Sequence, residues 1–356
     1  MRPGEPARCR RGSSVMTRGN PRRLRVLFVI PAPAEGAWHI FSKRQADALE
    51  RADIDLRRFY LHPWISLSTL VTEARRHWRE VRQFKPDIVH AQYGTMTSAL
   101  CAVLAPQKLV VTFRGSDLNP GHSVNFIRTR LGRILSQLSA LRANRIVCVS
   151  QELKDRLWWR KSVAVVIPSA VDTHVFHPQP RDEARRSLGW DPSERLVLLN
   201  VRDDPLGKGL RIAEAAVEIA RAEIGPIRLL VVRGDVPPER MPLYINASDC
   251  VLLASEWEGS PTIVQEAVAC NVPVVATNVG DVALRLQGIF PSRIVERSPA
   301  RLGAALAEVV SLGQRSNGTE KLGEISLDTT TRQLTELYND VVPDVTKRGR
   351  AKEAGV

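Results

Sequence analysis

The sequence has no apolar segment long enough to cross a membrane. Its longest apolar stretches, residues 195–201 and 227–232, have the length of β-strands, whereas a membrane-spanning helix needs about 20 apolar residues in succession. Nothing near the amino end resembles the apolar core of a signal peptide. The expected location is therefore cytoplasmic, with a peripheral position at the inner face of the cell membrane left open.

Metal-binding patterns are also scarce. Asp53-Ile54-Asp55 has the letters of an Asp-x-Asp metal motif, but it falls between a helix and a strand without helper ligands and indicates a solvated loop. Neither a metal nor a cofactor is expected. The five cysteines lack zinc-site spacing and indicate reduced, structural thiols: Cys9, Cys101, Cys148, Cys250 and Cys270.

Acidic residues are outnumbered by basic ones, which gives a formal net charge of +13. Residues 1–25 contribute +7 of it and residues 344–356 contribute +2, which leaves +4 for the rest of the chain. The two ends are rich in Arg, Gly, Pro and Ser, so residues 1–22 and 344–356 are expected to be disordered basic tails. No basic face has the aromatic or groove-reading elements that nucleic-acid binding requires, and that class of function is not expected.

The dinucleotide fingerprint G-x-G-x-x-G is absent, yet strand and helix patterns alternate along the chain. A buried-type strand at 23–33 leads through a loop with Gly36 into a helix, and the pattern restarts at 195–201. This alternation predicts an α/β protein with two doubly wound, Rossmann-like parallel sheets. The expected divisions are an N-terminal domain at 23–172, a linker at 173–184, a C-terminal domain at 185–326 and a last helix at 327–343.

The most informative segment is EWEGSPTIVQEAVACNVPVVAT, residues 256–277. It predicts a loop, a helix capped by Ser260 that starts at Pro261, a left-handed stop at Asn271 and a return strand. The start of a helix binds anions, whereas the carboxylates of Glu258 and Glu266 accept hydrogen bonds from hydroxyl groups. Together they indicate a ligand that carries a sugar, a diphosphate and a ribose.

A second loop, RDDPLGKG at 202–209, follows the strand at 195–201. Arg202 and Lys208 flank it at the carboxyl end of that strand, where ligands bind in open α/β sheets. Two cations and a helix start can stabilise a leaving diphosphate without a metal ion.

These motifs resemble the signature of the retaining glycosyltransferases of family 4, and the short region between Gly234 and Ala247 resembles the compact teichuronic-acid and capsular-polysaccharide type. The resemblance implies the GT-B fold, in which two Rossmann-like domains face each other across a cleft and the last helix returns to the N-terminal domain. It implies that Glu258 lies at the donor sugar, that Glu266 holds the ribose, and that Arg202 and Lys208 bind the diphosphate. The same donor loop contains Gly259, Ser260, Pro261 and Thr262.

On the N-terminal side the resemblance places Gly36 near the donor diphosphate and the acceptor. Residues 110–119 resemble the family's strand end, but Arg114 stands where histidine is common, and it could reach the phosphates or an acidic acceptor. Asp117 is a site candidate that could instead cap its loop. His90 could line the cleft or be a satisfied, half-buried histidine. Ser169-Ala170 replaces the usual Asn-Gly of the connector, which puts the turn geometry in question.

The implied activity is metal-independent, retaining transfer of a hexosyl group from a nucleotide-sugar, most often a UDP- or GDP-sugar. The implied acceptor is a glycan or a polyprenyl- or lipid-linked sugar of an envelope or extracellular polysaccharide. A GT-B nucleotide-sugar epimerase and a non-catalytic nucleotide-sugar-binding protein are the alternatives. Basic helices with aromatic residues suit either an anionic membrane surface or plain solvation: Arg75, Arg76, Arg79, Arg82, Lys85, Trp78, Phe84, Arg128, Arg130, Arg133 and Arg142.

Overall fold

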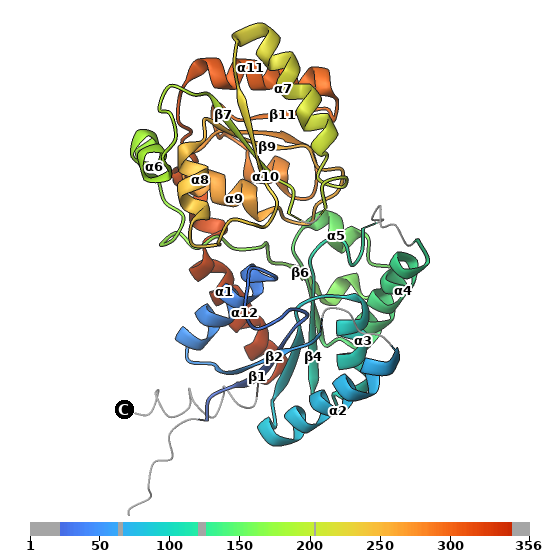
Figure 1. The fold of residues 1–356 in the computed structure, drawn as a ribbon. Helices are drawn as coiled ribbons and strands as arrows, with labels where there is room; N and C mark the ends of the chain where they lie inside the picture. The colour runs from blue at the N-terminus through green and yellow to red at the C-terminus, as the bar shows by residue number, and fades with distance from the viewer. Residues whose placement is uncertain (1–21, 63–66, 120–125, 203, 344–356) are drawn as a thin grey trace, which may run out of the picture.

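The computed structural model describes residues 22–62, 67–119, 126–202 and 204–343. The described chain forms two lobes, each a parallel β-sheet with helices on both faces, joined by a narrow connection (Figure 1). The predicted fold class is confirmed. Almost all of both predicted tails lies outside the described residues.

The N-terminal lobe contains a six-stranded parallel sheet in the order β2-β1-β3-β4-β5-β6. Helices α2, α3 and α4 lie together on one side of this lobe and α1 on the other (Figure 1). The strands are β1 Arg25–Ile30, β2 Asp55–Tyr60, β3 Ile88–Ala91, β4 Lys108–Phe113, β5 Arg145–Cys148 and β6 Ala164–Val166. The helices are α1 Ile40–Arg51, α2 Leu67–Phe84, α3 Thr95–Leu104, α4 Phe126–Arg142, α5 Gln151–Asp155 and the 3₁₀ turn η1 Lys161–Val163.

The C-terminal lobe contains a five-stranded parallel sheet in the order β11-β10-β9-β7-β8. Its strands are β7 Leu196–Asn200, β8 Arg228–Val232, β9 Cys250–Leu253, β10 Val274–Thr277 and β11 Arg293–Val295. The helical segments of this half are α6 Arg181–Leu188, α7 Leu210–Ile224, α8 Met241–Ala247, α9 Thr262–Ala269, α10 Val282–Arg285, α11 Pro299–Leu312, η2 Gly318–Glu324 and α12 Leu327–Val341.

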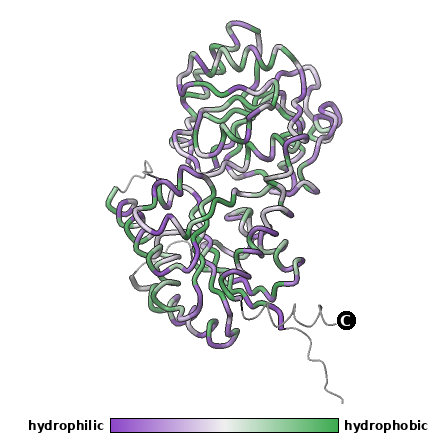
Figure 2. Tube along the Cα trace, turned by 180° about the vertical axis from the view of Figure 1, so that it is seen from behind, coloured by the Kyte–Doolittle hydropathy of each residue, from purple (hydrophilic) through white to green (hydrophobic). Residues whose placement is uncertain are grey.

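Both faces of each sheet are buried, as parallel sheets require. Along β1, Leu27 and Val29 enter the core beneath α2, α3 and α4, whereas Val26, Phe28 and Ile30 enter the core on the opposite face. The hydrophobic trace runs through the middle of both lobes (Figure 2). The four cysteines of the described residues are free and buried.

Helix α12 leaves the C-terminal lobe and packs on α1 of the N-terminal lobe (Figure 1). Leu334, Leu337 and Tyr338 complete the core on that face of the N-terminal sheet. Where the chain crosses between lobes, Val171 donates its N–H to Ile325 and accepts one from Leu327. Ala170 does not take a positive φ here, so this connector has no need of the Asn-Gly pair.

The Asp53-Ile54-Asp55 segment lies between α1 and β2, as the sequence indicated, with Asp55 as the first residue of β2. Asp53 is 2.7 Å from Arg23, and Asp55 is 3.0 Å from Arg25. These ion pairs hold the amino end of the sheet, the edge away from the carboxyl ends of the strands, and the expected loop role agrees with that position.

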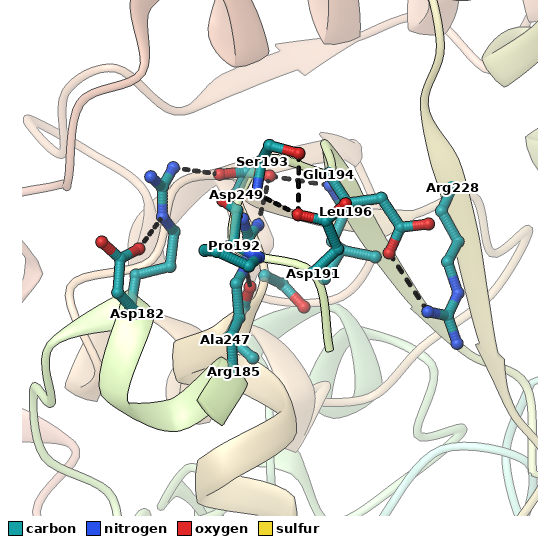
Figure 3. Close-up of polar contacts among 12 residues, drawn as sticks. Asp182, Arg185, Asp191, Pro192, Ser193, Glu194, Leu196, Arg228, Ala247 and Asp249 are labelled. Atoms are coloured by element: carbon teal, nitrogen blue, oxygen red, sulfur yellow. Dashed lines mark hydrogen bonds and ion pairs between the residues drawn. The ribbon is translucent and has the colours of Figure 1, made fainter. Parts of the chain in front are cut away.

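One buried carboxylate joins α6 and β7 to the strand β9 (Figure 3). The Asp249 oxygens accept hydrogen bonds from Arg181 at 2.7 Å, from Arg185 at 2.8 Å and from the backbone N–H of Leu196 at 2.7 Å. The side chain of Arg185 is 1% exposed, and it also donates to the carbonyl of Ala247. Removing the charge of Asp249 would leave a guanidinium buried without its counter-ion.

We expect Asp249→Asn to lower the free energy of unfolding by about 3 kcal/mol or more, because breaking one side of a buried ion pair costs that amount. Asp182→Asn is the matched control, since Asp182 pairs with Arg181 at an exposed position and such pairs contribute about 1 kcal/mol or less. Urea unfolding followed by circular dichroism measures both. Equal unfolding midpoints for the two variants would contradict the role given to Asp249.

Candidate active site

The signature loop follows β9, and the helix α9 follows the loop. The helix begins at Thr262 with Pro261 at the cap position, one residue later than predicted, and no side chain caps it. Ser260 is not the cap because its hydroxyl donates to Asp281 at 2.9 Å and accepts from Gln265 at 2.7 Å. Asn271 takes the predicted left-handed conformation, with φ of 54°. The first N–H groups of α9 have no partners within the helix and face away from it along its axis.

Lys208 and Glu258 meet at the carboxyl edge of the C-terminal sheet. The Lys208 ammonium is 2.5 Å from Glu258 Oε1, which also accepts a hydrogen bond from Ser255 at 2.7 Å. Asp204 builds the loop that presents Lys208, since its carboxylate accepts from the N–H of Gly207 and its carbonyl from the N–H of Lys208. A diphosphate and a sugar bound here would contact a cation and a carboxylate that already touch each other.

Arg202 reaches across to the other lobe. Its backbone takes a φ of 48°, and its guanidinium donates to the carbonyl of Ala37 at 3.3 Å. That carbonyl adjoins Gly36, whose own carbonyl accepts from Lys43 Nζ at 2.9 Å. The Gly36 loop is therefore held against the cationic loop of the C-terminal lobe.

Glu266 projects from α9 toward α1. Its carboxylate lies 3.8 Å from the Arg44 guanidinium, and both side chains are largely buried. Burial raises the pKa of Glu266 to about 7, and the positive charges of Arg44 and Arg202 oppose this rise. Arg44 also stacks on Phe176, which lies in the connector between the lobes.

His39 lies among the cations of this region. Its Nδ1 is buried and has no hydrogen-bond partner. Burial, together with the positive charges of Arg114, Arg202 and Lys43, lowers the pKa of His39 to about 3. His39 is consequently a neutral ring.

Arg114 does not point toward the donor site. Its guanidinium donates to Gln92 and Gln45 and stacks on Phe41, within the N-terminal lobe. Burial lowers its pKa to about 9. Arg114 therefore has a structural role beneath the site, in place of the contact with phosphates or an acidic acceptor that the sequence suggested.

Asp117 caps its own loop, which is the alternative to a role in the site that the sequence left open. Its carboxylate accepts backbone N–H groups from Gly94, Arg114 and Gly115, and its side chain is fully buried. Burial raises its pKa, and the backbone hydrogen bonds act against this rise. Asp117 holds the strand ends in place and is not placed to contact a substrate.

His90 does not line the cleft, which corrects that expectation. It is fully buried, with Nδ1 at 2.5 Å from the Tyr338 hydroxyl and Nε2 at 2.7 Å from the Thr112 hydroxyl. Burial holds its pKa well below the usual range. Nδ1 thereby joins α12 to the N-terminal sheet, and Nε2 joins β3 to the neighbouring strand β4.

The two lobes touch through the loops of this site. Asn119 Nδ2 donates to the carbonyl of Glu258 at 3.1 Å, and the N–H of Gly280 donates to Glu152 at 3.1 Å. A Cβ on Gly259 would lie 2.0 Å from the carbonyl oxygen of Arg114, so this approach requires glycine.

The site therefore assembles part of the predicted set. Gly36, Arg202, Lys208, Glu258, Gly259, Ser260, Pro261, Thr262 and Glu266 lie at the junction of the lobes, whereas His90, Arg114 and Asp117 lie behind it. Sequence reasoning missed His39, Lys43 and Arg44. They lie in the segment HIFSKR, directly after the Gly36 loop, but nothing in that segment indicates that its helix faces the C-terminal lobe.

No group of three or more His, Cys, Asp or Glu residues among the described residues is placed to hold a metal ion. None of the described helices has both the length and the hydropathy of a membrane span.

Two segments of the chain match glycosyltransferase family models. Residues 35–175 match the family model "Glycosyltransferase Family 4", and residues 220–285 match "Glycosyl transferases group 1". Over 250 residues the chain is 26% identical to the putative teichuronic acid biosynthesis glycosyltransferase TuaC of Bacillus subtilis, which covers 65% of this chain and 62% of TuaC. It is 30% identical to the D-inositol 3-phosphate glycosyltransferase of Segniliparus rotundus over 44% of this chain and 41% of that protein.

Solved structures share the fold at low identity. The sucrose-phosphate synthase of Thermosynechococcus elongatus has a TM-score of 0.74 at 16% identity and covers 90% of this chain and 99% of its own. Anabaena HepE in complex with UDP and glucose has a TM-score of 0.68 at 16% identity, over 89% and 100%. The UDP-GlcNAc 2-epimerase of Methanocaldococcus jannaschii has a TM-score of 0.57 at 12% identity, over 89% and 99%. The chain thus combines a glycosyltransferase family 4 domain with a group 1 glycosyl transferase segment on the GT-B fold.

The raised pKa of Glu266 predicts a pH-dependent stability of the empty protein. Because the folded-state pKa of about 7 exceeds the ordinary value of 4.5, the folded state binds the proton more tightly, and stability falls as pH rises between these values. The loss at pH 8 amounts to about 3 kcal/mol. Glu266→Gln carries no charge, so it should unfold at a higher temperature than the unsubstituted protein at pH 8, and the gap should shrink at pH 5.

Thermal unfolding at pH 5 and pH 8 measures this gap. Glu214→Gln, at an exposed position on α7, is the matched control and should show no comparable dependence. A gap for Glu266→Gln that is the same at both pH values would contradict the raised pKa.

Proposed function

We propose that the protein transfers a hexosyl group from a nucleotide-sugar to a hydroxyl group of a glycan or lipid-linked acceptor, with retention of anomeric configuration and without a metal ion or cofactor. One observation carries the proposal. Lys208 pairs with Glu258 at the carboxyl edge of the C-terminal sheet, and Arg202, from the same loop as Lys208, donates to Ala37 of the other lobe, so that two cations and one carboxylate lie where the lobes meet. The cations suit a diphosphate, and the carboxylate suits the hydroxyl groups of a sugar.

Each residue then has a defined task. Lys208, Arg202 and the start of α9 stabilise the negative charge that develops on the leaving diphosphate. Glu258 accepts hydrogen bonds from the donor sugar, and Glu266 accepts them from the ribose. Glu258 pairs with Lys208, and a bound diphosphate takes over the role of counter-ion.

The transfer breaks one bond and forms another without a nucleophile from the protein. The bond between the anomeric carbon and the phosphate oxygen breaks, and the electron pair leaves with the diphosphate. The acceptor hydroxyl bonds to the anomeric carbon on the same face, and the leaving phosphate oxygen takes its proton. The buried carboxyls of the described site need to transfer no proton in this scheme.

The donor and acceptor classes draw on the relatives. HepE, which shares the fold, holds UDP and glucose, so a UDP-sugar is the first candidate donor and a GDP-sugar the second. TuaC is named for teichuronic acid biosynthesis, which favours an envelope or extracellular polysaccharide as the product. A lipid-linked acceptor of that kind would be reached at the inner face of the cell membrane.

A nucleotide-sugar epimerase is the second candidate, because a UDP-GlcNAc 2-epimerase shares the fold. It would interconvert free nucleotide-sugars and need no acceptor. A binding protein without catalysis would bind the donor and neither transfer nor hydrolyse it. Analysis of the sugar-nucleotide pool after incubation separates the three.

We expect Lys208→Ala to lower kcat/KM for nucleoside-diphosphate release by about 30- to 1000-fold, because one charge-assisted contact to the leaving group contributes about 2–4 kcal/mol. Release would be measured over a panel of UDP-, GDP-, ADP- and dTDP-sugars. Lys321→Ala removes the same charge at an exposed position of η2 and should leave the rate unchanged. Equal rates for the two variants would rule out the role of Lys208.

The metal-free, retaining chemistry has its own test. With the active donor, release should survive EDTA, and proton NMR of the first product should show the anomeric configuration of the donor. An inverted product, or activity that EDTA removes and Mg²⁺ or Mn²⁺ restores, would refute this part of the proposal. Free sugar nucleotide converted to an epimer would favour the epimerase.

A further inference from the structure

The outer face of α4 is apolar and exposed. Ile127 and Leu131 are 77% and 54% exposed, and further exposed aliphatic side chains follow at spacings of three and four residues. Such spacing places them on one stripe of the helix. The stripe consists of Ile127, Leu131, Ile134, Leu138 and Leu141.

An apolar cavity opens beside this stripe, between α2 and α3. Its volume is about 550 Å³, and all its lining residues except Arg75 are apolar. Val103, at its rim on α3, is 82% exposed. Five of the other lining residues are Leu70, Val71, Met96, Ala99 and Leu135.

A second hollow of about 740 Å³ adjoins the apolar cavity, and the two share Trp78, Val103 and Leu104. Its lining includes three cations, which are Arg82, Lys85 and Arg142. Arg82 lies over the ring of Trp78 at 4.3 Å, where the two cavities meet. A hollow lined by three cations thus lies next to a hollow whose lining is apolar except for Arg75, as the two halves of an anionic phospholipid would require.

The charges of this face are of one sign. Helices α3 and α4 contain no acidic residue. The two glutamates of α2 form ion pairs with other arginines, Glu73 with Arg76 and Glu80 with Arg57. No ion pair links Arg82, Lys85 or Arg142 to a carboxylate among the residues that the structure describes. Phe84, which the sequence placed among the aromatic residues of this face, is not exposed on it, because its ring is buried beneath Arg25 and Arg57.

We propose that the face made by α2, α3 and α4 binds the surface of a bilayer that contains anionic phospholipids. The phosphate group of a lipid lies at Arg82, Lys85 and Arg142, one of its acyl chains enters the apolar cavity, and the α4 stripe lies in the interface. A second copy of the chain fits this face poorly, because a symmetric contact would bring arginines against arginines. The inference goes beyond the sugar transfer proposed above and does not depend on it.

The test is sedimentation of the full chain with vesicles of phosphatidylcholine alone and with about a third phosphatidylglycerol. Binding is expected only with the anionic lipid. Each basic residue at such a surface contributes about a fivefold factor, so Arg82→Gln with Lys85→Gln should weaken binding about 25-fold. Arg186→Gln with Arg211→Gln changes the net charge equally at exposed positions of the C-terminal lobe and should bind like the unsubstituted protein.

A second double variant tests the apolar part. Val103→Gln with Leu131→Gln keeps every charge and alters two exposed side chains, so thermal unfolding should be unchanged. Its binding should fall at least about tenfold, most clearly in high salt, where the electrostatic attraction is screened.

Three results would overturn the proposal. The first is equal binding to neutral and anionic vesicles or to neither. The second is equal loss in the Arg82/Lys85 variant and in the Arg186/Arg211 control, which would indicate attraction by net charge alone. The third is a lipid-free dimer, seen by analytical ultracentrifugation, that Val103→Gln with Leu131→Gln dissociates, which would make the face a contact between copies.

Discussion

The site depends on how closely two backbones approach between the lobes. Gly259 lies against the carbonyl of Arg114, and a Cβ there would overlap it at 2.0 Å. Because these loops touch, Arg202 reaches Ala37 and Arg44 reaches Glu266 from opposite sheets. Each of these two contacts joins a residue of one lobe to a residue of the other, so neither lobe forms the site alone. The carboxyl edges of two parallel sheets, turned toward each other, bring the loops together.

Electrostatics gives this junction its chemical character. Arg44 and Arg202 act on the carboxylate of Glu266, and Lys208 pairs with that of Glu258. The acids of the site differ in their part: Glu258 balances Lys208 by direct contact, whereas burial raises the pKa of Glu266 and so favours its neutral form. A ligand with two negative charges and several hydroxyl groups satisfies the cations and leaves the carboxylates as acceptors, which is the composition of a nucleotide-sugar.

Local sequence patterns predicted what depends on local structure. Strand and helix periodicity was enough for both sheets, and the pattern of residues 256–277 was enough for the loop, the helix and the return strand of that segment. The cap at Ser260 was wrong because that hydroxyl is used by Asp281, which is distant in sequence. His90 could not be placed because its partner, Tyr338, is 248 residues away.

The residues that sequence reasoning missed share one property. Lys43 and Arg44 lie on a helix whose pattern is that of an ordinary amphipathic helix, and only the fold places that helix opposite α9. The three helices of the opposite face were recognised as basic, but the apolar cavity between α2 and α3 arises from their packing. Contacts between elements that are far apart in the chain carry no local signal.

Helix α12 links the C-terminal half of the chain to the N-terminal residues of the site. It packs on α1, the helix that carries Lys43 and Arg44, and its Tyr338 is fastened to His90 in the centre of the N-terminal sheet. The chain crosses between the lobes twice, and Val171 joins both crossings by hydrogen bonds to Ile325 and Leu327. The two crossings therefore form a single strap. A displacement of one lobe about this strap moves Arg44 relative to Glu266 and Arg202 relative to Ala37, so the same connection that holds the lobes together sets the geometry of the site.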